Sequence, residues 1–321
     1  MKRRLVLGSI LAVGVLSAVA GAMQQAPPAG AAQGRGRGPA APPSAAALTV
    51  DKVTETLFVI RGGGGNTAVF IMAAGVALVD TKIAGWGQPL IERVRELTDK
   101  PVTLLINTHA HYDHSEGNVE FPTTVDVVAH ENAAKLMPEQ RTPLGVQPIG
   151  RNVFKDTNGR NLPKRTYRDR MTIGEGNERI ERHHFGPAHT SGDTFVVFPA
   201  LRAMHTGDAF PNKGVPIMDG NNGGSGVQYA DTLDRAAALP NIDTVITGHN
   251  ATTLTMADVK MYSDFNRNFV DAVRGAKMAG QTLDQFAAAW KVPERFVTWG
   301  STQPNAARLR ANAGVVWDEL K

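Results

Sequence analysis

The sequence lacks cysteine altogether and carries little excess charge. The absence of cysteine excludes thiol and disulfide chemistry, and it excludes attachment of a lipid to an N-terminal cysteine. The formal net charge is +4, but residues 1–22 hold three of the 34 basic residues and none of the 30 acidic ones. The rest of the chain is therefore almost neutral, which gives no general case for binding nucleic acid.

The first 22 residues have the pattern of an export signal. Lys2, Arg3 and Arg4 precede an apolar, uncharged run at 5–20, and the small residues at its end provide a cleavage site. We expect a signal peptide at residues 1–22, and hence a periplasmic or secreted protein without a stable membrane anchor. An uncleaved anchor helix is the alternative, and the two arginines weakly resemble a twin-arginine signal.

The composition changes twice after this segment. Residues 23–46 are rich in Ala, Gly, Pro and Gln, which cannot bury a core and therefore predict a flexible linker. From Leu48 onward the pattern is that of a globular protein, so we predict one domain over residues 47–321. Within it, residues 138–170 show little periodicity and predict irregular structure.

Short runs of β-branched and aromatic residues predict strands, and apolar residues at helical spacing predict helices. The predicted strands are 56–60, 67–72, 76–80, 102–106, 125–129, 180–185, 194–198, 203–205 and 245–246. The predicted helices are 90–97, 131–137, 229–239, 255–279 and 282–290. Strands and helices alternate in two β-rich halves, which favours an α+β protein with two packed sheets and flanking helices.

The strongest functional signal follows the strand at 102–106. Within six residues, His109, His111, Asp113 and His114 supply three imidazoles and one carboxylate, the side chains that suit zinc. A loop leaving a strand can aim alternate side chains at one point. His109 and His111 can then share one ion while Asp113 and His114 turn toward a second. A polar turn without a metal is the alternative.

Three later turns at predicted strand ends carry further candidates. His189 lies in the turn 186–193, Asp208 follows the strand that ends at His205, and His249 follows the strand at 245–246. Functional residues often occupy such loops, because a rigid sheet positions them. A carboxylate at Asp208 could bridge two cations held roughly 3.5–4 Å apart.

With these residues in this order, the chain from about residue 48 to 290 clearly resembles the metallo-β-lactamase superfamily. The resemblance implies an αβ/βα four-layer sandwich with the site at one edge. Seven side chains are the implied metal ligands: His109, His111 and His189 at one zinc, Asp113, His114 and His249 at the other, and Asp208 bridging them. Asp80 would hold a ligand from behind, with a simple strand-ending aspartate as the alternative.

Differences from the site residues of particular branches indicate which part of the superfamily the chain resembles most. Subclass B1 β-lactamases place a cysteine at the second zinc, which this chain cannot do, and the B3 type lacks the bridging aspartate. The pattern is nearer to the glyoxalase II and lactonase branches. His111 replaces the glutamate of the diiron relatives, which favours hydrolysis over redox chemistry. The loops at 61–66 and 220–226 are implied to border the site, although four glycines in the first also fit a flexible hairpin.

The resemblance implies an exported hydrolase with two Zn²⁺ per chain, with iron or manganese as alternatives. A hydroxide bridging the ions would attack an ester, lactone, thioester or β-lactam in a small-molecule substrate, and Asp113 would orient it and accept its proton. A mononuclear iron persulfide dioxygenase and a non-catalytic metal-binding module are the rival functions. A structural role is favoured for Tyr112, Tyr229, His183 and His184, and the sequence does not indicate an oligomeric state.

Overall fold

The computed structural model describes residues 42–146, 148 and 150–320. The predicted signal peptide, residues 1–22, and most of the predicted linker, residues 23–46, lie outside the described residues. Among the helices that are described, none has the length and apolar character needed to cross a membrane.

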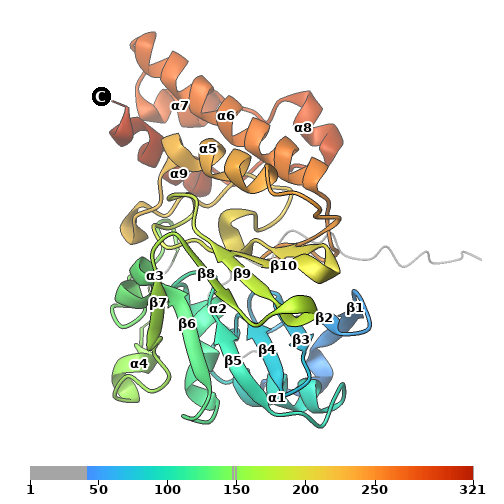
Figure 1. Ribbon diagram of the computed structural model, residues 1–321. Helices are drawn as coiled ribbons and strands as arrows, with labels where there is room; N and C mark the ends of the chain where they lie inside the picture. Colours follow the sequence, from blue (N-terminus) through green and yellow to red (C-terminus); the bar gives the residue numbers. More distant parts are fainter. Residues whose placement is uncertain (1–41, 147, 149, 321) are drawn as a thin grey trace, which may run out of the picture. The chain divides into compact units, whose positions relative to one another are not determined.

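The strands form two sheets that face each other (Figure 1). The first, in spatial order, contains β1 (Thr49–Lys52), β2 (Leu57–Arg61), β3 (Thr67–Ile71), β4 (Val76–Val79), β5 (Val102–Ile106), β6 (Asp126–His130) and β7 (Arg165–Tyr167). The second contains β12 (Thr244–Ile246), β11 (Ala203–His205), β10 (Phe195–Phe198), β9 (Ile180–His183) and β8 (Arg170–Ile173). β4 to β7 pair in parallel, as do β11 and β12.

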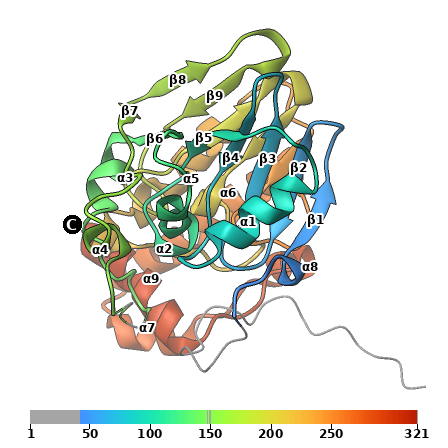
Figure 2. The same cartoon turned by 90° about the horizontal axis from the view of Figure 1, so that it is seen from below.

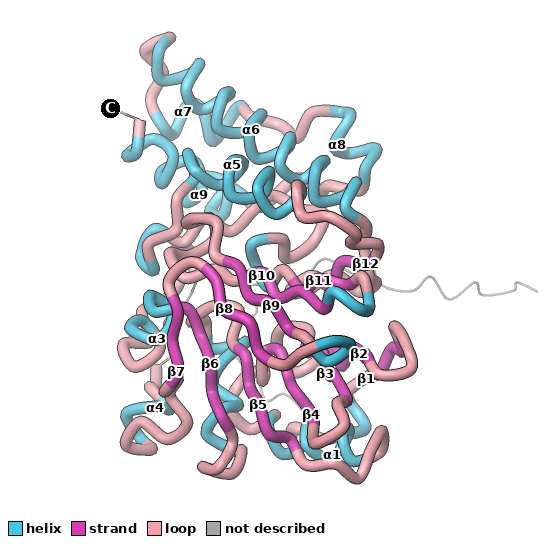
Figure 3. The backbone as a smooth tube through the Cα atoms, in the orientation of Figure 1, coloured by secondary structure: helices cyan, strands magenta, loops and turns pink. Residues whose placement is uncertain are grey.

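Helices cover the outer face of each sheet, as the tube drawing shows (Figure 3). On the side of the first sheet lie α1 (Gly87–Arg95), α2 (Tyr112–Ser115), α3 (Glu131–Leu136) and α4 (Val153–Asp156), with α1 crossing β2 to β4 (Figure 2). Over the second sheet lie α5 (Gly226–Ala237), α6 (Met256–Met278), α7 (Leu283–Ala289), α8 (Glu294–Trp299) and α9 (Ala306–Glu319).

The alternation of side chains along each strand produces these layers. In β3, Ala68 and Phe70 point into the core between the sheets, whereas Val69 packs toward Leu90 of α1. Because successive strand residues face opposite sides, a strand that is buried on both faces can join two cores. The predicted αβ/βα four-layer sandwich is confirmed.

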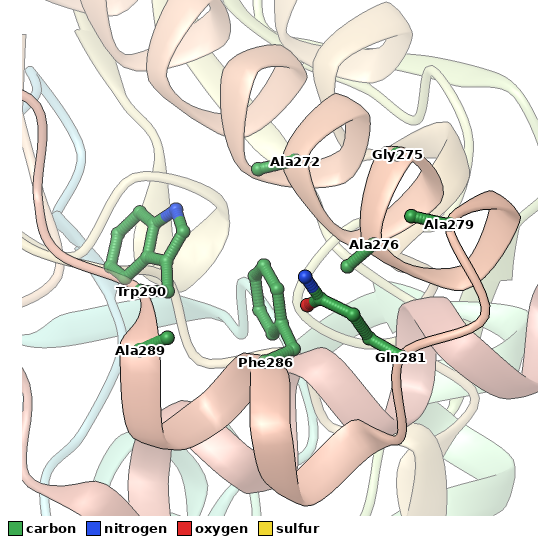
Figure 4. A pocket seen from close by; sticks show the side chains of 8 residues that line it. All are labelled: Ala272, Gly275, Ala276, Ala279, Gln281, Phe286, Ala289 and Trp290. Carbon is green, nitrogen blue, oxygen red and sulfur yellow. The ribbon is translucent and has the colours of Figure 1, made fainter.

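An apolar groove lies between α6 and α7, within the helical layer (Figure 4). Phe286 and Trp290 form one wall, and Ala272 and Ala276 form the other. The groove has a volume of about 300 Å³, and none of the predicted metal ligands lines it. It is therefore separate from the site described below.

A buried arginine lies in the core between the sheets. Arg182 in β9 is fully buried, and none of its three side-chain nitrogens has a hydrogen-bond partner among the described residues. Its guanidinium lies 5.8 Å from the ring centre of Tyr167, and burial lowers its pKa to about 10. Folding thus disfavours the charged form of this side chain.

We therefore predict that Arg182→Met raises the free energy of unfolding by about 1–2 kcal/mol, because the cost of burying the charge exceeds the lost contact with the Tyr167 ring. Urea denaturation measures the change. Arg165→Met is the matched control, since Arg165 is half exposed and paired with Asp126, and we expect a change within about 0.5 kcal/mol. A less stable Arg182→Met protein would contradict the account of an uncompensated charge.

Candidate metal centre

The predicted ligands lie on loops that leave strands of both sheets at one edge of the sandwich. Asp80 follows β4, the histidine-rich loop follows β5, and His189 lies in the turn between β9 and β10. Asp208 follows β11 and His249 follows β12. The structure brings all eight predicted side chains into one cluster: Asp80, His109, His111, Asp113, His114, His189, Asp208 and His249.

One group within the cluster consists of three buried histidines. His111 Nδ1 lies 2.8 Å from His189 Nε2, and the ligand atoms of His109, His111 and His189 all lie within 4.8 Å of one another. His189 Nδ1 donates to the carbonyl of Ile217 at 2.6 Å, and His111 Nε2 lies 2.7 Å from Asp219 Oδ2. These contacts hold a proton on the outer nitrogen of each ring, so the inner nitrogens face each other with lone pairs.

Asp80 orients the other two histidines of the loop after β5. Its Oδ2 lies 2.7 Å from His114 Nδ1 and also accepts the Thr108 hydroxyl at 2.7 Å. Because that hydroxyl donates to Asp80, it accepts from His109 Nδ1 at 3.0 Å, which leaves His109 Nε2 as a lone pair. Asp80 thus contacts His114 directly and His109 through the Thr108 hydroxyl, an arrangement that can orient both rings.

The second group contains Asp113, His114 and His249. His114 Nε2 lies 3.2 Å from His249 Nε2, and Asp113 Oδ2 lies 3.4 Å from the same atom of His249. The side chains of Asp113 and His249 are 18% and 17% exposed, whereas that of His114 is fully buried. This group therefore forms the open side of the centre.

The carboxylate of Asp208 faces both groups. Its Oδ1 lies 3.3 Å from His114 Nε2, and its Oδ2 lies 3.2 Å from His249 Nε2 and 3.7 Å from His189 Nε2. Gly248 permits this approach, because a Cβ at that position would lie 1.8 Å from Asp208 Oδ1. The placement is the one expected of a bridging ligand.

Unsatisfied polar atoms test whether metal ions fit this cluster. His109 Nε2 and Asp208 Oδ1 are buried and have no hydrogen-bond partner among the described residues. Buried polar atoms without partners are rare, because each costs free energy. Two imidazole lone pairs 2.8 Å apart also repel unless a cation lies between them. The donor set of imidazoles and carboxylates therefore fits divalent metal ions.

The pKa shifts in the cluster also favour the binding of metal ions. The pKa of His109 lies well below its ordinary value, because burial and the neighbouring histidines disfavour its charged form. Burial also lowers the pKa of His189, to about 4. Burial alone would lower the pKa of His114, but the carboxylates of Asp208, Asp113 and Asp80 raise it well above its ordinary value. Neutral imidazoles on one side and crowded carboxylates on the other are suited to bind cations.

The glycine-rich loop after β2 supports the cluster from one side. A Cβ at Gly65 would lie 2.2 Å from His114 Cε1, so only glycine fits there. The Gly65 amide donates to the carbonyl of Asp113, and Asn66 Nδ2 donates to the carbonyl of Thr247. Lys82, fully buried, donates to the carbonyl of Gly65. The loop is therefore tied to the ligand loops by specific contacts.

The structure adds one residue that the sequence had not indicated. Asp219 is fully buried and accepts from His111, from Asn222 Nδ2 at 2.6 Å, and from the amide of Leu144 at 2.9 Å. Burial alone would raise its pKa, but the hydrogen bond from His111 and the other donors lower it to about 2. It adjoins the predicted border loop 220–226, and that proximity was the only available signal.

We predict that Asp219→Ala weakens zinc binding by about 10–100-fold, because His111 loses the partner that fixes its ring and its proton. Competition with a chromophoric chelator measures the affinity. Asp258→Ala is the matched control, because Asp258 also has a pKa lowered to about 2 but caps α6 and binds Lys213. Equal zinc affinities in the two variants would contradict the prediction.

Four further histidines and tyrosines have structural contacts. His130 caps α3 by accepting from the Asn132 amide, His183 contacts Glu181, and His184 Nδ1 donates to the carbonyl of Asp193. Tyr229 donates to the main-chain carbonyl of Asp208 at 3.0 Å and so holds that ligand from behind. The contacts of His183, His184 and Tyr229 agree with the structural role favoured for these residues above.

A sandwich of two sheets and two helical layers, with histidines and aspartates gathered at one edge, defines a metal-binding protein of the αβ/βα type. Residues 60–249 match the family model of the metallo-beta-lactamase superfamily. The chain belongs to this superfamily, whose members are mostly hydrolases.

Two curated relatives match part of the chain. Hydroxyacylglutathione hydrolase of Rhodospirillum rubrum is 27% identical over 179 residues, covering 55% of this chain and 57% of that protein. The alpha subunit of 2,4-dinitroanisole O-demethylase from a Nocardioides species is 24% identical over 168 residues, covering 50% of this chain and 46% of that protein. The chain thus spans about half the length of the curated relatives it matches.

Solved structures share the fold. The sec-alkylsulfatase Pisa1 from Pseudomonas sp. has a TM-score of 0.64 at 16% identity, covering 85% of this chain and 50% of that one. A metallo-beta-lactamase from Pontibacter korlensis has a TM-score of 0.55 at 16% identity, covering 69% of this chain and 99% of that one.

Proposed function

We propose that the protein is an exported dinuclear zinc hydrolase that cleaves an ester, lactone, thioester or β-lactam bond in a small molecule. The observation that carries the proposal is the pair of facing ligand groups, His109/His111/His189 and Asp113/His114/His249, with the carboxylate of Asp208 between them. Each group has the number and type of donors that zinc takes in catalytic sites.

When bound, two zinc ions would polarise the substrate oxygen and lower the pKa of a coordinated water toward 7. The chain's own residues supply the rest. Asp113, which is 18% exposed at the open side, would orient a water and accept its proton. Asp80 and Asp219 hold His114 and His111 in fixed orientations from behind.

Among the four bond types, the thioester has independent support. The 27% identical relative is named for hydrolysis of a glutathione thioester, and its match covers 55% of this chain. The second group, Asp113, His114 and His249, is the set that the resemblance to the superfamily implies, and the absence of cysteine separates it from subclass B1 β-lactamases. Export rests on the pattern of residues 1–22.

A substrate panel tests the proposal. The purified, zinc-loaded protein is incubated with a hydroxyacyl thioester of glutathione, a lactone, a nitrophenyl ester and nitrocefin, and product release is recorded. We expect hydrolysis of at least one substrate, with the thioester cleaved fastest. The contrary outcome has two parts: no substrate of the panel is hydrolysed, and the iron-loaded protein consumes oxygen when a glutathione persulfide is added. That outcome would contradict the hydrolase and favour the persulfide dioxygenase.

A further inference from the structure

One short segment holds two metal-binding histidines at once. His189 Nδ1 donates to the carbonyl of Ile217, and His111 donates to the carboxylate of Asp219. The amide of Asp219 also donates to the carbonyl of His189 at 3.0 Å. Residues 216–219 belong to no helix or strand, and only Asp219 takes part in a helical turn, as the cap of the 3-10 turn Gly220–Asn222. Residues 216–218 therefore depend on other contacts for their position. The orientation of the His111 and His189 rings therefore depends on the contacts that hold residues 216–219 in position.

The C-terminal helix α9 contacts this segment through the buried side-chain amide of Asn312. Asn312 is fully buried, its Oδ1 accepts from the amide of Met218 at 3.0 Å, and its Nδ2 donates to the carbonyl of Pro216. The side chain thus pairs with the main chain on both sides of Ile217, much as a neighbouring strand would. The carbonyl of Ile217 is the group that accepts the hydrogen bond from His189 Nδ1.

Two further contacts from the same face of α9 reach the site. Arg308, one turn before Asn312, donates to the carbonyl of Leu144 at 3.0 Å, and the amide of Leu144 donates to Asp219. Val315 lies against Gly220, where an added Cβ would come within 3.3 Å of it. Residues three and four apart on a helix share a face, so α9 presents one continuous surface to the segment.

We propose that α9 is a positioning element of the metal centre, with Asn312 as its central residue. This inference rests on the proposed function as a dinuclear metal site. The helix lies beyond residue 249, where the match to the superfamily model ends, so that match does not include this support. Asn312 is not a ligand; it acts through the carbonyl of Ile217 and the carboxylate of Asp219.

Removal of the Asn312 side chain would leave the Met218 amide and the Pro216 carbonyl buried without partners, and the segment would shift to satisfy them. Ligand distances at metal sites lie within about 0.2 Å of their usual values, so a shift of the segment would misplace His111 and His189. We therefore expect Asn312→Ala to lower the affinity for the ion held by His109, His111 and His189 by about 10–100-fold. Loss of the hydrogen-bond partner behind a metal ligand has an effect of this size in other proteins. The ion held by Asp113, His114 and His249 should be little affected.

The experiment compares stepwise zinc affinities of the full chain with those of Asn312→Ala, Arg308→Ala and Ser263→Ala, using chelator competition and the absorption bands of the cobalt-substituted protein. Ser263 is the matched control, because it is buried and joins α5 to α6 in the same helical layer without touching residues 216–219. We expect one of two affinities to fall in Asn312→Ala, a smaller fall in Arg308→Ala, and none in Ser263→Ala.

Two results would overturn the inference: unchanged affinities in both Asn312→Ala and Arg308→Ala, or an equal fall in Ser263→Ala. Because Arg308 is partly exposed, its variant keeps the test decisive if Asn312→Ala does not fold. The proposed function fails separately. If the wild-type chain binds only one ion, the dinuclear site is contradicted. If Asn312→Ala lowers the affinity for that one ion, the positioning role of α9 is still supported.

Discussion

Replacing Asp113 by asparagine should lower kcat by about 10²–10⁴-fold while changing KM little. The amide keeps an oxygen that can coordinate a metal ion, but it cannot accept a proton from the attacking water. We assign this task to Asp113 because it is one of the two partly exposed members of the second ligand group, at 18% exposure beside His249. Steady-state kinetics on the substrate identified by the panel measure the effect.

Metal content must be determined on the same Asp113→Asn sample, so that loss of an ion is distinguished from loss of a base. Asp126→Asn is the matched control, since Asp126 is a partly exposed aspartate at the start of β6 that pairs with Arg165 away from the site. We expect its kcat to equal that of the wild type. A fully loaded Asp113→Asn enzyme with wild-type kcat would remove Asp113 from the mechanism.

Removing the metal ions should lower the thermal stability of the protein by roughly 8–16 °C. A ligand present at 1,000 times its dissociation constant stabilises the native state by about 4 kcal/mol, and each kcal/mol shifts Tm by about 2–4 °C in a domain of this size. The physical source is the cluster itself, where His109 Nε2 and Asp208 Oδ1 have no hydrogen-bond partner among the described residues and imidazole lone pairs face each other.

Calorimetry of the protein before and after treatment with a chelator measures this shift, and added zinc should restore the original Tm whereas magnesium should not. The variant His109→Ala/His189→Ala provides the control, because its first ligand group is incomplete and the chelator should change its Tm much less. Equal Tm values for the loaded and the stripped wild-type protein would show that the cluster does not hold metal tightly.

Much of the fold could be predicted because its strands are short, apolar and buried on both faces. Val102–Ile106 and Ala203–His205 were predicted to the residue, and the predicted helices at 229–239 and 255–279 correspond to α5 and α6. β1 was missed because only Val50 among its four residues is partly buried, so the strand carries little apolar pattern.

Other elements depend on tertiary contacts that no local pattern contains. β7 lies in the stretch 138–170, which was predicted to be irregular. It is a strand because it pairs with β6, and its composition gives no sign of that pairing. β8 follows directly and exposes Arg170 and Thr172 on one face. α9 was not predicted, because its polar residues include the buried Asn312, which local periodicity cannot distinguish from an exposed one.

The candidate ligands could be predicted because their spacing is short and their residue types are few. The residues behind them could not, because Asp219 lies 108 positions from His111 and Asn312 lies 94 positions from Met218. An aspartate in a Gly- and Asn-rich turn is typical of turns in general. Only the folded arrangement shows that its carboxylate is buried against an imidazole.

The metal content of the purified full-length protein, determined by mass spectrometry against its amino-acid concentration, tests the central claim most directly. Two ligand groups with Asp208 between them predict about two zinc ions per chain, and Asp208→Ala should lower that number. One iron ion per chain, retained through purification and unaffected by Asp208→Ala, would contradict the dinuclear zinc centre.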